Sequence, residues 1–280
     1  MEPITLTPAV AAKFLQHLTG QEKSRSTRQQ YWRSAAAFAK FAGGRPVTKA
    51  LVLQYKAALQ QRYAARSVNA ALAALNCLFS FLGQPGLRCK SVKLQRQIYC
   101  PEEKELTKQE YERLCRAALL QKNTRLYLLL QTVCGTGIRV SELPFITVQA
   151  AQSGQATVRC KGKIRTVFLV KPLRQKLLRY AAQQGIVQGK IFVTKTGKPL
   201  DRANIWREMK GLCAAAGINP KKVFPHNLRH LFARVFYGLE KDLAKLADIL
   251  GHASIETTRI YIISTGSEHR RKLEKMHLIL

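Results

Sequence analysis

Acidic residues are scarce in this chain of 280 residues, which has 16 Asp and Glu against 47 Lys and Arg, a formal net charge of +31. Between Glu2 and Glu102 the only acidic residue is Glu22. Such an excess of one charge opposes compact folding by self-repulsion unless a polyanion neutralises it. Nucleic acid is the expected partner, because phosphate contacts and counterion release dominate such binding. An inert basic surface or a weak membrane-surface protein is the alternative.

Long apolar runs and paired cysteines are also missing. No stretch approaches the roughly 20 apolar residues that a membrane span needs. The start MEPITLTPAV has no basic segment followed by an apolar run, so a secretory signal is not expected. The seven cysteines form no C-x-x-C pair, and their odd number argues against a disulfide framework. We expect free thiols in a cytoplasmic protein, with neither a metal site nor a cofactor.

The first part of the chain has the apolar spacing of a helical bundle. Residues 5–83 contain four segments in which apolar residues recur at helical intervals, as Phe14 and Leu18 do in the first segment. The second segment ends at Gly43 and Gly44 and the fourth at Gly83. Because the connections are short, we predict a compact four-helix bundle over residues 1–84.

Residues 85–105 have a different composition. Pro85, Gly86 and Pro101 interrupt the segment, and it is rich in Lys and Arg. We interpret it as an extended basic linker between two domains. A surface loop is the alternative, but its position between two patterned regions favours the linker.

Residues 106–280 form the second predicted domain. It begins with a capping box at Thr107 and two helices. Two strands, residues 156–160 and 166–170, follow and are joined by a turn, and residues 191–193 suggest a third short strand. Helices resume at the N-cap Asp201 and continue to an amphipathic helix over residues 266–280. The predicted fold is mainly α, with a mixed α+β second domain that contains a small antiparallel sheet.

Two segments of this domain place a basic residue at a turn. In GTGIRVSEL, two glycines allow one helix to end before another begins, so that Arg139 lies near a helix N-terminus, where anions are favoured. At residues 161–163, KGK forms the predicted hairpin turn, and either Lys161 or Lys163 can reach over a ligand. Taken alone, a solvated turn lysine is the more common case.

Two later segments carry histidines, an arginine and a tyrosine. His226 and Arg229 lie three residues apart on one helical face, an arrangement that suits a phosphate. His230 follows directly and is interpreted as structural. His252 lies in the turn after Leu250 and Gly251, and Tyr261 is expected two turns into the next helix, where a tyrosine is often a half-buried core residue.

Together and in this order, the four segments resemble the tyrosine recombinases, also called the phage-integrase family. The family pattern is an Arg in a T-G-x-R-x-S-E-L turn, a hairpin Lys, an H-x-x-R pair, an L-G-H turn, and a Tyr nine residues after that His. The matching residues here are Arg139, Lys161, His226, Arg229, His252 and Tyr261. The departures, Asn227 and Leu231, fall at positions that are not catalytic in the family.

The resemblance spans about residues 105–280, and the alignment of its hairpin favours Lys161 over Lys163. The N-terminal bundle is similar to the SAM-like core-binding domain of the family, with weaker motif support. The whole chain is therefore similar to the simple two-domain, Xer-like type.

The resemblance implies site-specific cleavage and rejoining of double-stranded DNA through a 3′-phosphotyrosine at Tyr261. Arg139 and Arg229 would neutralise the phosphate, His226 would accept the tyrosine proton, and Lys161 would protonate the leaving 5′ oxygen. It also implies four protomers on two DNA sites, a Holliday junction, and exchange of the C-terminal helix between protomers. Relaxation of DNA like that of a type IB topoisomerase and a non-catalytic DNA-binding regulator are the alternatives. Donation of the tyrosine in cis or in trans is open.

Overall fold

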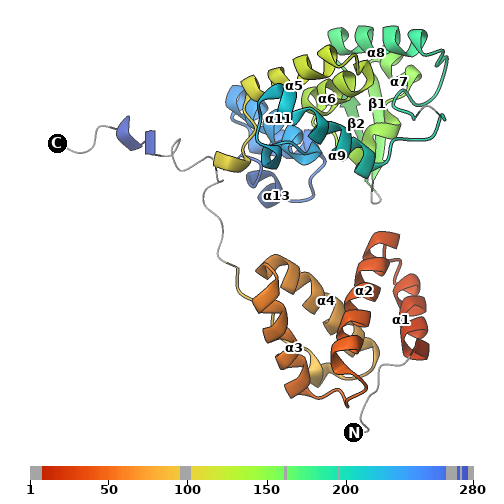
Figure 1. Ribbon diagram of the computed structural model, residues 1–280, viewed down its shortest axis with the longest axis vertical. Coiled ribbons are helices and arrows are strands. Elements are labelled where there is room, and N and C mark those ends of the chain that lie inside the picture. The colour runs from red at the N-terminus through yellow and green to blue at the C-terminus, as the bar shows by residue number, and fades with distance from the viewer. Residues whose placement is uncertain are drawn as a thin grey trace. The chain divides into compact units, whose positions relative to one another are not determined.

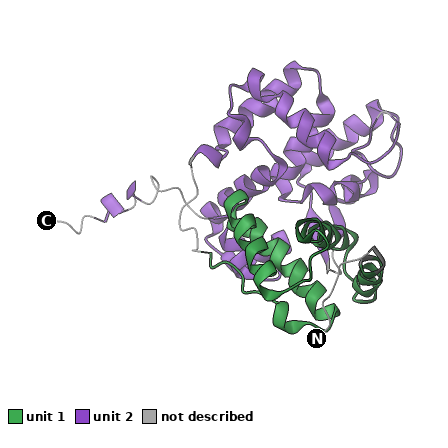
Figure 2. Cartoon of the chain, turned by 60° about the horizontal axis from the view of Figure 1, so that its bottom comes forward, with its two compact units in different colours: residues 1–96 green, residues 97–280 purple. Residues whose placement is uncertain are grey.

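The computed structural model describes residues 8–94, 102–160, 163–194, 196–262, 270–271 and 273–276. The chain divides into two compact units, Met1–Arg96 and Gln97–Leu280 (Figures 1 and 2). Each unit has its own hydrophobic core. No helix within the described ranges combines the length and the hydrophobicity that crossing a bilayer requires.

The first unit is the helical bundle expected from the sequence. Phe14, Phe38 and Phe79 are completely buried at its centre, because each lies on the apolar stripe of its helix. Side-chain caps at Ser24 and Thr48 begin the second and third helices. The elements within residues 8–94 are α1 (Pro8–Gly20), α2 (Arg25–Ala42), α3 (Lys49–Arg62), α4 (Ala65–Phe81) and the 3-10 turn η1 (Pro85–Leu87).

The segment after η1 lies along the first unit, held by two asparagines of α4. The Asn76 side chain accepts from Cys89 N and donates to Cys89 O, both at 2.9 Å. Asn69 pairs in the same way with the backbone of Val92, at 2.8 and 2.9 Å. Each asparagine thus satisfies both backbone groups of one residue, as a neighbouring strand would. The start of the expected linker therefore packs with the first unit.

The second unit is built around the apolar helix α6. Leu128, Leu129 and Leu130 are at most 1 % exposed, so this helix is buried on several sides. It packs against α5, α8, α9 and α11. Its C-terminal end therefore lies inside the unit. The helices up to the sheet are the 3-10 turn η2 (Glu102–Lys104), α5 (Lys108–Leu120), α6 (Thr124–Thr136), the 3-10 helix η3 (Val140–Phe145) and α7 (Val148–Ser153).

The later helices of this unit carry the remaining motifs. Asp201 caps α9 and Ser254 caps α13, as the sequence predicts. The elements after the sheet are α8 (Lys171–Gln183), α9 (Arg202–Gly211), α10 (Cys213–Ala216), the 3-10 turn η4 (Pro220–Lys222), α11 (Pro225–Glu240), α12 (Leu243–Leu250) and α13 (Ile255–Arg259). Most of the helix expected over residues 266–280 lies outside the described residues.

The antiparallel sheet has two strands among the described residues, β1 (Gln155–Cys160) and β2 (Lys163–Phe168). The first strand agrees with the sequence prediction, whereas the second begins three residues earlier than the expected residue 166. The register places Val158 opposite Arg165. With this register Ala156, Val158 and Val167 are buried on one face of the sheet. Lys163 pairs with Cys160, so the basic start of β2 belongs to the strand and not to the turn.

The prediction of a third strand at residues 191–193 is wrong. Within the described part of the chain these residues form only an isolated bridge, between Val193 and Pro199. Ile191 and Phe192 are nevertheless buried, at 0 % and 2 % exposure. Their hydrophobicity therefore reflects packing in the core and not pairing in a sheet.

Candidate active site

Arg139 follows the end of α6 and is partly buried. Gly137 ends the helix with a left-handed backbone, φ +65°, and its N–H donates to Val133 O. A Cβ at this glycine would lie 2.4 Å from a ring carbon of Phe232, so both the conformation and the space require glycine. Arg139 follows as the N-cap residue of η3. The expected position of Arg139 at a helix N-terminus is confirmed, although that helix is 3-10.

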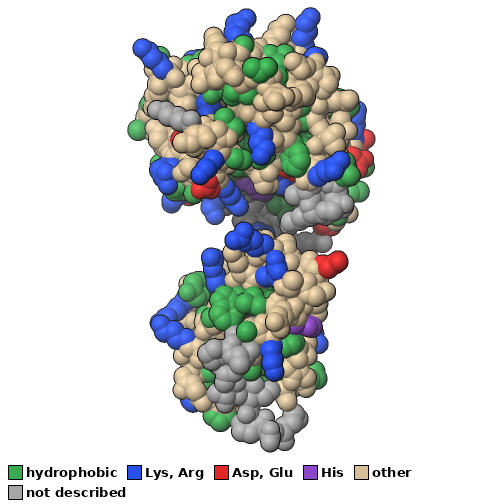
Figure 3. Space-filling view, turned by 90° about the vertical axis from the view of Figure 1, so that its right-hand side faces the viewer, with side chains coloured by type: hydrophobic (Ala, Val, Ile, Leu, Met, Phe, Trp, Pro, Cys, Tyr) green, Lys and Arg blue, Asp and Glu red, His purple; other side chains and the backbone are tan. Residues whose placement is uncertain are grey.

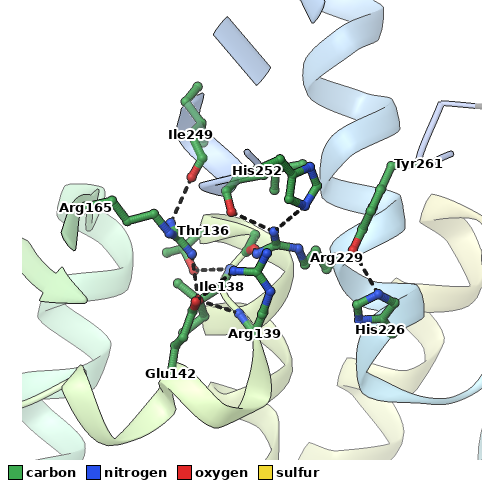
Figure 4. A network of polar contacts seen from close by, with 12 residues as sticks. Thr136, Ile138, Arg139, Glu142, Arg165, His226, Arg229, Ile249, His252 and Tyr261 are labelled. Atoms are coloured by element: carbon green, nitrogen blue, oxygen red, sulfur yellow. Dashed lines mark hydrogen bonds and ion pairs between the residues drawn. The ribbon is translucent and has the colours of Figure 1, made fainter. Parts of the chain in front are cut away.

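A buried carboxylate holds Arg139 in place. Glu142 is 1 % exposed, and its Oε2 accepts from Arg139 N at 2.8 Å, while its Oε1 accepts from Arg139 Nη1 at 3.0 Å. Oε2 also accepts from Nη2 of Arg165 on β2, at 2.6 Å. One glutamate therefore pairs with two guanidiniums, as a buried carboxylate must to be retained in the interior (Figure 4).

Arg165 connects the sheet to the turn after α12. Its Nη1 donates to Ile249 O at 2.8 Å. A Cβ on Gly251 would lie 2.5 Å from Arg165 Cδ, so the arginine crosses directly over this glycine. The sheet, η3 and the turn that carries His252 are thereby joined through Arg165 and Glu142.

Arg229 of α11 lies at the centre of the cluster and is completely buried. Its Nη1 donates to Gly137 O, and its Nη2 donates to Leu250 O at 2.7 Å. Nη2 also contacts Nε2 of His252 at 2.9 Å. Nε is buried without a hydrogen-bond partner among the described residues. The guanidinium is thus oriented by the ends of α6 and α12.

Tyr261 lies against the histidines of α11. Its hydroxyl is 2.8 Å from Nε2 of His226, and its ring stacks on that of His230, with centroids 4.2 Å apart. The carbon of the Arg229 guanidinium lies 5.6 Å from the centre of the tyrosine ring. Tyr261 is 6 % exposed. It follows the end of α13 at Arg259, so the expectation that it lies two turns inside a helix is corrected.

Burial and neighbouring arginines keep these histidines neutral. The pKa of His252 falls to about 4, because of burial and then the charges of Arg229, Arg139 and Arg165. Burial also lowers the pKa of His230 to about 4. The pKa of His226 is lowered by partial burial, and then by the charges of Arg229, Arg139 and Arg202. Burial lowers the pKa of Arg229 to about 10, so it stays a cation at neutral pH.

Five of the six site residues expected from the sequence therefore lie in one cluster: Arg139, His226, Arg229, His252 and Tyr261 (Figure 4). Lys161 lies outside the described residues. Lys163 is the first residue of β2, and its side chain lies outside the described part as well. The choice between the two lysines therefore stays a prediction.

Three residues of the network were not expected from the sequence: Glu142, Arg165 and Thr258. Glu142 stands inside the GTGIRVSEL segment, where its place three residues after Arg139 is the spacing of a capping box. Arg165 gave no local signal, because its partners are distant in the chain. Thr258 is completely buried, and its hydroxyl oxygen lies within hydrogen-bond distance of Nδ1 of His252, at 2.8 Å.

Basic side chains outnumber acidic ones on the visible face of the molecule (Figure 3). Lys and Arg side chains are spread over the visible face of each unit, with few acidic groups (Figure 3). Within the described residues no three His, Cys, Asp or Glu side chains gather as metal ligands would. The arrangement offers buried cations, neutral imidazoles and a phenol, which together suit the charge of a phosphodiester.

Comparison with known families identifies both units. Residues 104–268 match the family described as "Phage integrase family", and residues 11–84 match "Phage integrase, N-terminal SAM-like domain". The chain is 30 % identical to the tyrosine recombinase XerA of Pyrococcus furiosus (strain ATCC 43587 / DSM 3638 / JCM 8422 / Vc1). That alignment covers 100 % of this chain and 98 % of the relative.

Solved structures share the fold. A crystal structure of XerA recombinase has 28 % sequence identity and a TM-score of 0.54, covering 97 % of this chain and 99 % of that one. A lambda integrase tetramer bound to a Holliday junction has 18 % identity and a TM-score of 0.75, covering 93 % of this chain and 78 % of that one. The similarity therefore extends over both units.

Proposed function

The chain belongs to the phage integrase family and is a tyrosine-type site-specific DNA recombinase, and we propose that Tyr261 is the nucleophile that cleaves the DNA. The observation that carries the proposal is the 2.8 Å contact between the Tyr261 hydroxyl and Nε2 of His226. Free tyrosine has a pKa of ~10, so it needs a proton acceptor and nearby cations to attack phosphorus. Both lie within the cluster.

The two arginines supply the charge that the reaction requires. Negative charge on the non-bridging oxygens grows as a five-coordinate phosphorus forms, and preorganised donors stabilise it most effectively. Arg229 is held by two backbone carbonyls and retains a buried Nε–H that lacks a partner among the described residues. A phosphate oxygen is the acceptor that this donor fits. Arg139, which Glu142 orients, provides the second guanidinium.

The chemical steps then use residues of this chain alone. The Tyr261 oxygen bonds to phosphorus, its proton passes to neutral His226, and the bond to the 5′ oxygen breaks. The product is a 3′-phosphotyrosine, and a hydroxyl from another strand reverses the attack to rejoin the DNA. Family resemblance assigns protonation of the leaving 5′ oxygen to Lys161. Because no water enters, the energy of the phosphodiester is retained.

The substrate in this proposal is double-stranded DNA, bound by four protomers on two sites with a Holliday junction between the exchanges. The lambda integrase structure in the comparison is a tetramer on such a junction. The net charge of +31 suits the phosphate backbone. Such an enzyme works in the compartment of its DNA, which we take to be the cytoplasm.

The test of the function is covalent capture of DNA. The chain is incubated with DNA that flanks its gene, carrying a nick that lets the cleaved end diffuse away, and denatured adducts are separated. We expect an adduct with the wild type and none with Tyr261→Phe, which should bind DNA equally well. Tyr127→Phe, a matched change on α6 outside the site, should behave like the wild type. An adduct in Tyr261→Phe would remove Tyr261 from its role.

Relaxation of plasmids separates recombination from topoisomerase activity. A type IB topoisomerase relaxes supercoiled DNA that lacks any special site. We expect the chain to leave such plasmids supercoiled and to recombine plasmids that carry its flanking DNA. Relaxation of every plasmid without recombination would contradict site specificity.

Docking of the C-terminal segment on a neighbouring protomer is the proposed basis of assembly. A groove of about 600 Å³ on the second unit is lined by Leu106, Leu231 and Ile262 together with charged side chains, two of which, Arg271 and Lys275, belong to the C-terminal segment of the same chain. Leu273 and Met276 of the C-terminal segment are half exposed and offer the matching apolar side chains. Removing residues 268–280 should weaken pairing of two DNA sites and spare binding to one. Unchanged recombination would contradict this role.

We also propose that the tyrosine acts in cis, because Tyr261 contacts His226 of its own chain. Mixing Tyr261→Phe with Arg229→Ala tests this, since each protomer then lacks one essential group. Cleavage in cis predicts no adduct from the mixture, and an adduct from the mixture would show donation in trans.

A further inference from the structure

The two ring nitrogens of His252 have different partners. Nε2 lies 2.9 Å from Arg229 Nη2, and Nδ1 lies 2.8 Å from the hydroxyl oxygen of Thr258. A guanidinium has donors only, so Nε2 must present its lone pair to Arg229. The single proton of the neutral ring is therefore on Nδ1, where it is donated to Thr258 Oγ1.

Thr258 belongs to the short helix that precedes the nucleophile. It is completely buried and faces the cluster, whereas its neighbour Thr257 is exposed. The carbonyl of Thr258 accepts the backbone N–H of Tyr261 at 2.9 Å. The residue that receives the His252 proton is thus joined directly to the residue that carries the phenol.

The tautomer of His252 has a consequence for Arg229. Both hydrogens of Nη2 are taken, one by Leu250 O and the other by His252 Nε2, so the plane of the guanidinium is set. With the proton on Nε2 instead, the imidazole would present a donor to a donor, and Arg229 would lose this partner. In this structure His252 therefore contacts Arg229 as an acceptor.

We propose that Thr258 is a positioning residue whose hydroxyl binds Nδ1 of His252, holds the ring against Arg229 Nη2 and thereby orients Arg229 for the phosphate. Because Thr258 lies on α13, this orientation is complete only when α13 is docked against the cluster. Placement of the tyrosine and alignment of the arginine are then a single event. The proposal rests on the function proposed above, and it adds a residue and a coupling to that site.

The test compares three variants of the full chain. Thr258→Val removes the hydroxyl and keeps the shape, Thr258→Ser keeps the hydroxyl, and Thr257→Val is the matched control on the same helix. Nitrogen NMR of ring-labelled histidine reports which nitrogen carries the proton, with the His252 signal identified by its loss in His252→Gln. Adduct formation and DNA affinity are measured on the same samples.

We expect the Nδ1–H form of His252 in the wild type, in Thr258→Ser and in Thr257→Val. Thr258→Val should shift the Nδ1 signal, because the hydrogen bond to Oγ1 is lost, and should slow adduct formation about 5- to 10-fold, the effect of about one hydrogen bond, with unchanged DNA affinity. If Thr258→Val does not fold, Thr258→Ala removes the same hydroxyl.

An unshifted Nδ1 signal in Thr258→Val would overturn the proposal. A shifted Nδ1 signal with an unchanged rate would overturn the link to Arg229. If the wild type formed no adduct, the proposed function would fail, while the NMR result would still decide whether Thr258 holds His252.

Discussion

Nε2 of His226 lies 2.8 Å from the hydroxyl oxygen of Tyr261, within a single chain and without DNA. The partly desolvated imidazole has a lowered pKa, so at neutral pH it offers a lone pair to the phenol. The arginines that lower this pKa, Arg229 first and then Arg139, are the groups proposed to bind the phosphate. One set of charges thus keeps the base neutral and neutralises the substrate.

Adduct formation should depend on neutral His226. Its pKa lies below the ordinary ~6.5, so the rate should stay level as the pH falls to about 6.5 and should decline only at lower pH. His17→Gln, which changes a histidine of the first unit, should leave the profile unaltered. A decline that begins above pH ~7 would show that His226 is not the acceptor.

Stability must be followed over the same pH range. His230 and His252 have pKa values of about 4 in the folded chain, against ~6.5 when unfolded. The unfolded state therefore binds more protons between these values, and the free energy of unfolding falls as the pH is lowered through them. Unfolding measured at each pH separates this loss from protonation of His226.

DNA with a changed leaving group should identify the catalytic lysine. DNA with sulfur in place of the bridging 5′ oxygen leaves as a thiolate, which needs no general acid. Lys161→Ala should therefore cleave ordinary DNA slowly and sulfur-substituted DNA at nearly the wild-type rate. Lys163→Ala should affect both substrates equally. The reverse pattern would assign the role to Lys163.

Removing the charge of Glu142 should destabilise the second unit. Glu142→Gln leaves Arg139 and Arg165 without their carboxylate, and breaking such a buried pair costs about 3 kcal/mol. Glu240→Gln is the control, because its pair with Lys245 is about half exposed and is screened by water, so that its loss should have little effect. The two tryptophans are Trp32 and Trp206, one in each unit, so Trp206 fluorescence in a Trp32→Phe background reports on the second unit. Equal effects of the two glutamine variants would contradict the prediction.

Gly251 should tolerate alanine less well than Gly185. Both have left-handed backbones, with φ of +65° and +67°, and both therefore pay about 1 kcal/mol for a side chain. Only at Gly251 would the new Cβ meet Arg165 Cδ, at 2.5 Å, whereas the space at Gly185 is open. Gly251→Ala should cost about 1–3 kcal/mol more than Gly185→Ala. Equal costs would show that Arg165 moves aside freely.

Much of the fold follows from local patterns in the sequence. The helices of the first unit and the caps at Thr107, Asp201 and Ser254 depend on neighbouring residues, so their signals are local. The sequence predicts a strand at residues 191–193, because a short apolar run does not distinguish pairing from packing, whereas the structure buries Ile191 and Phe192 in the core. β2 begins at Lys163, three residues before the expected start, because its first basic residues pair with β1.

The motifs brought five site residues together, but not their contacts. The sequence places Arg229 on the same helical face as His226 but does not show its burial, which is complete because the ends of α6 and α12 supply carbonyls to it. The contacts of Arg165 with Glu142 and Ile249 span 23 and 84 residues of the chain. Such contacts depend on tertiary packing, which periodicity does not encode.

The most direct measurement is the identification of the amino acid that is linked to DNA. The adduct is digested with protease and nuclease, and mass spectrometry locates the nucleotide on the remaining peptide. We expect a 3′-phosphate ester on the phenol of Tyr261. Attachment at another residue, or through a 5′-phosphate, would contradict it.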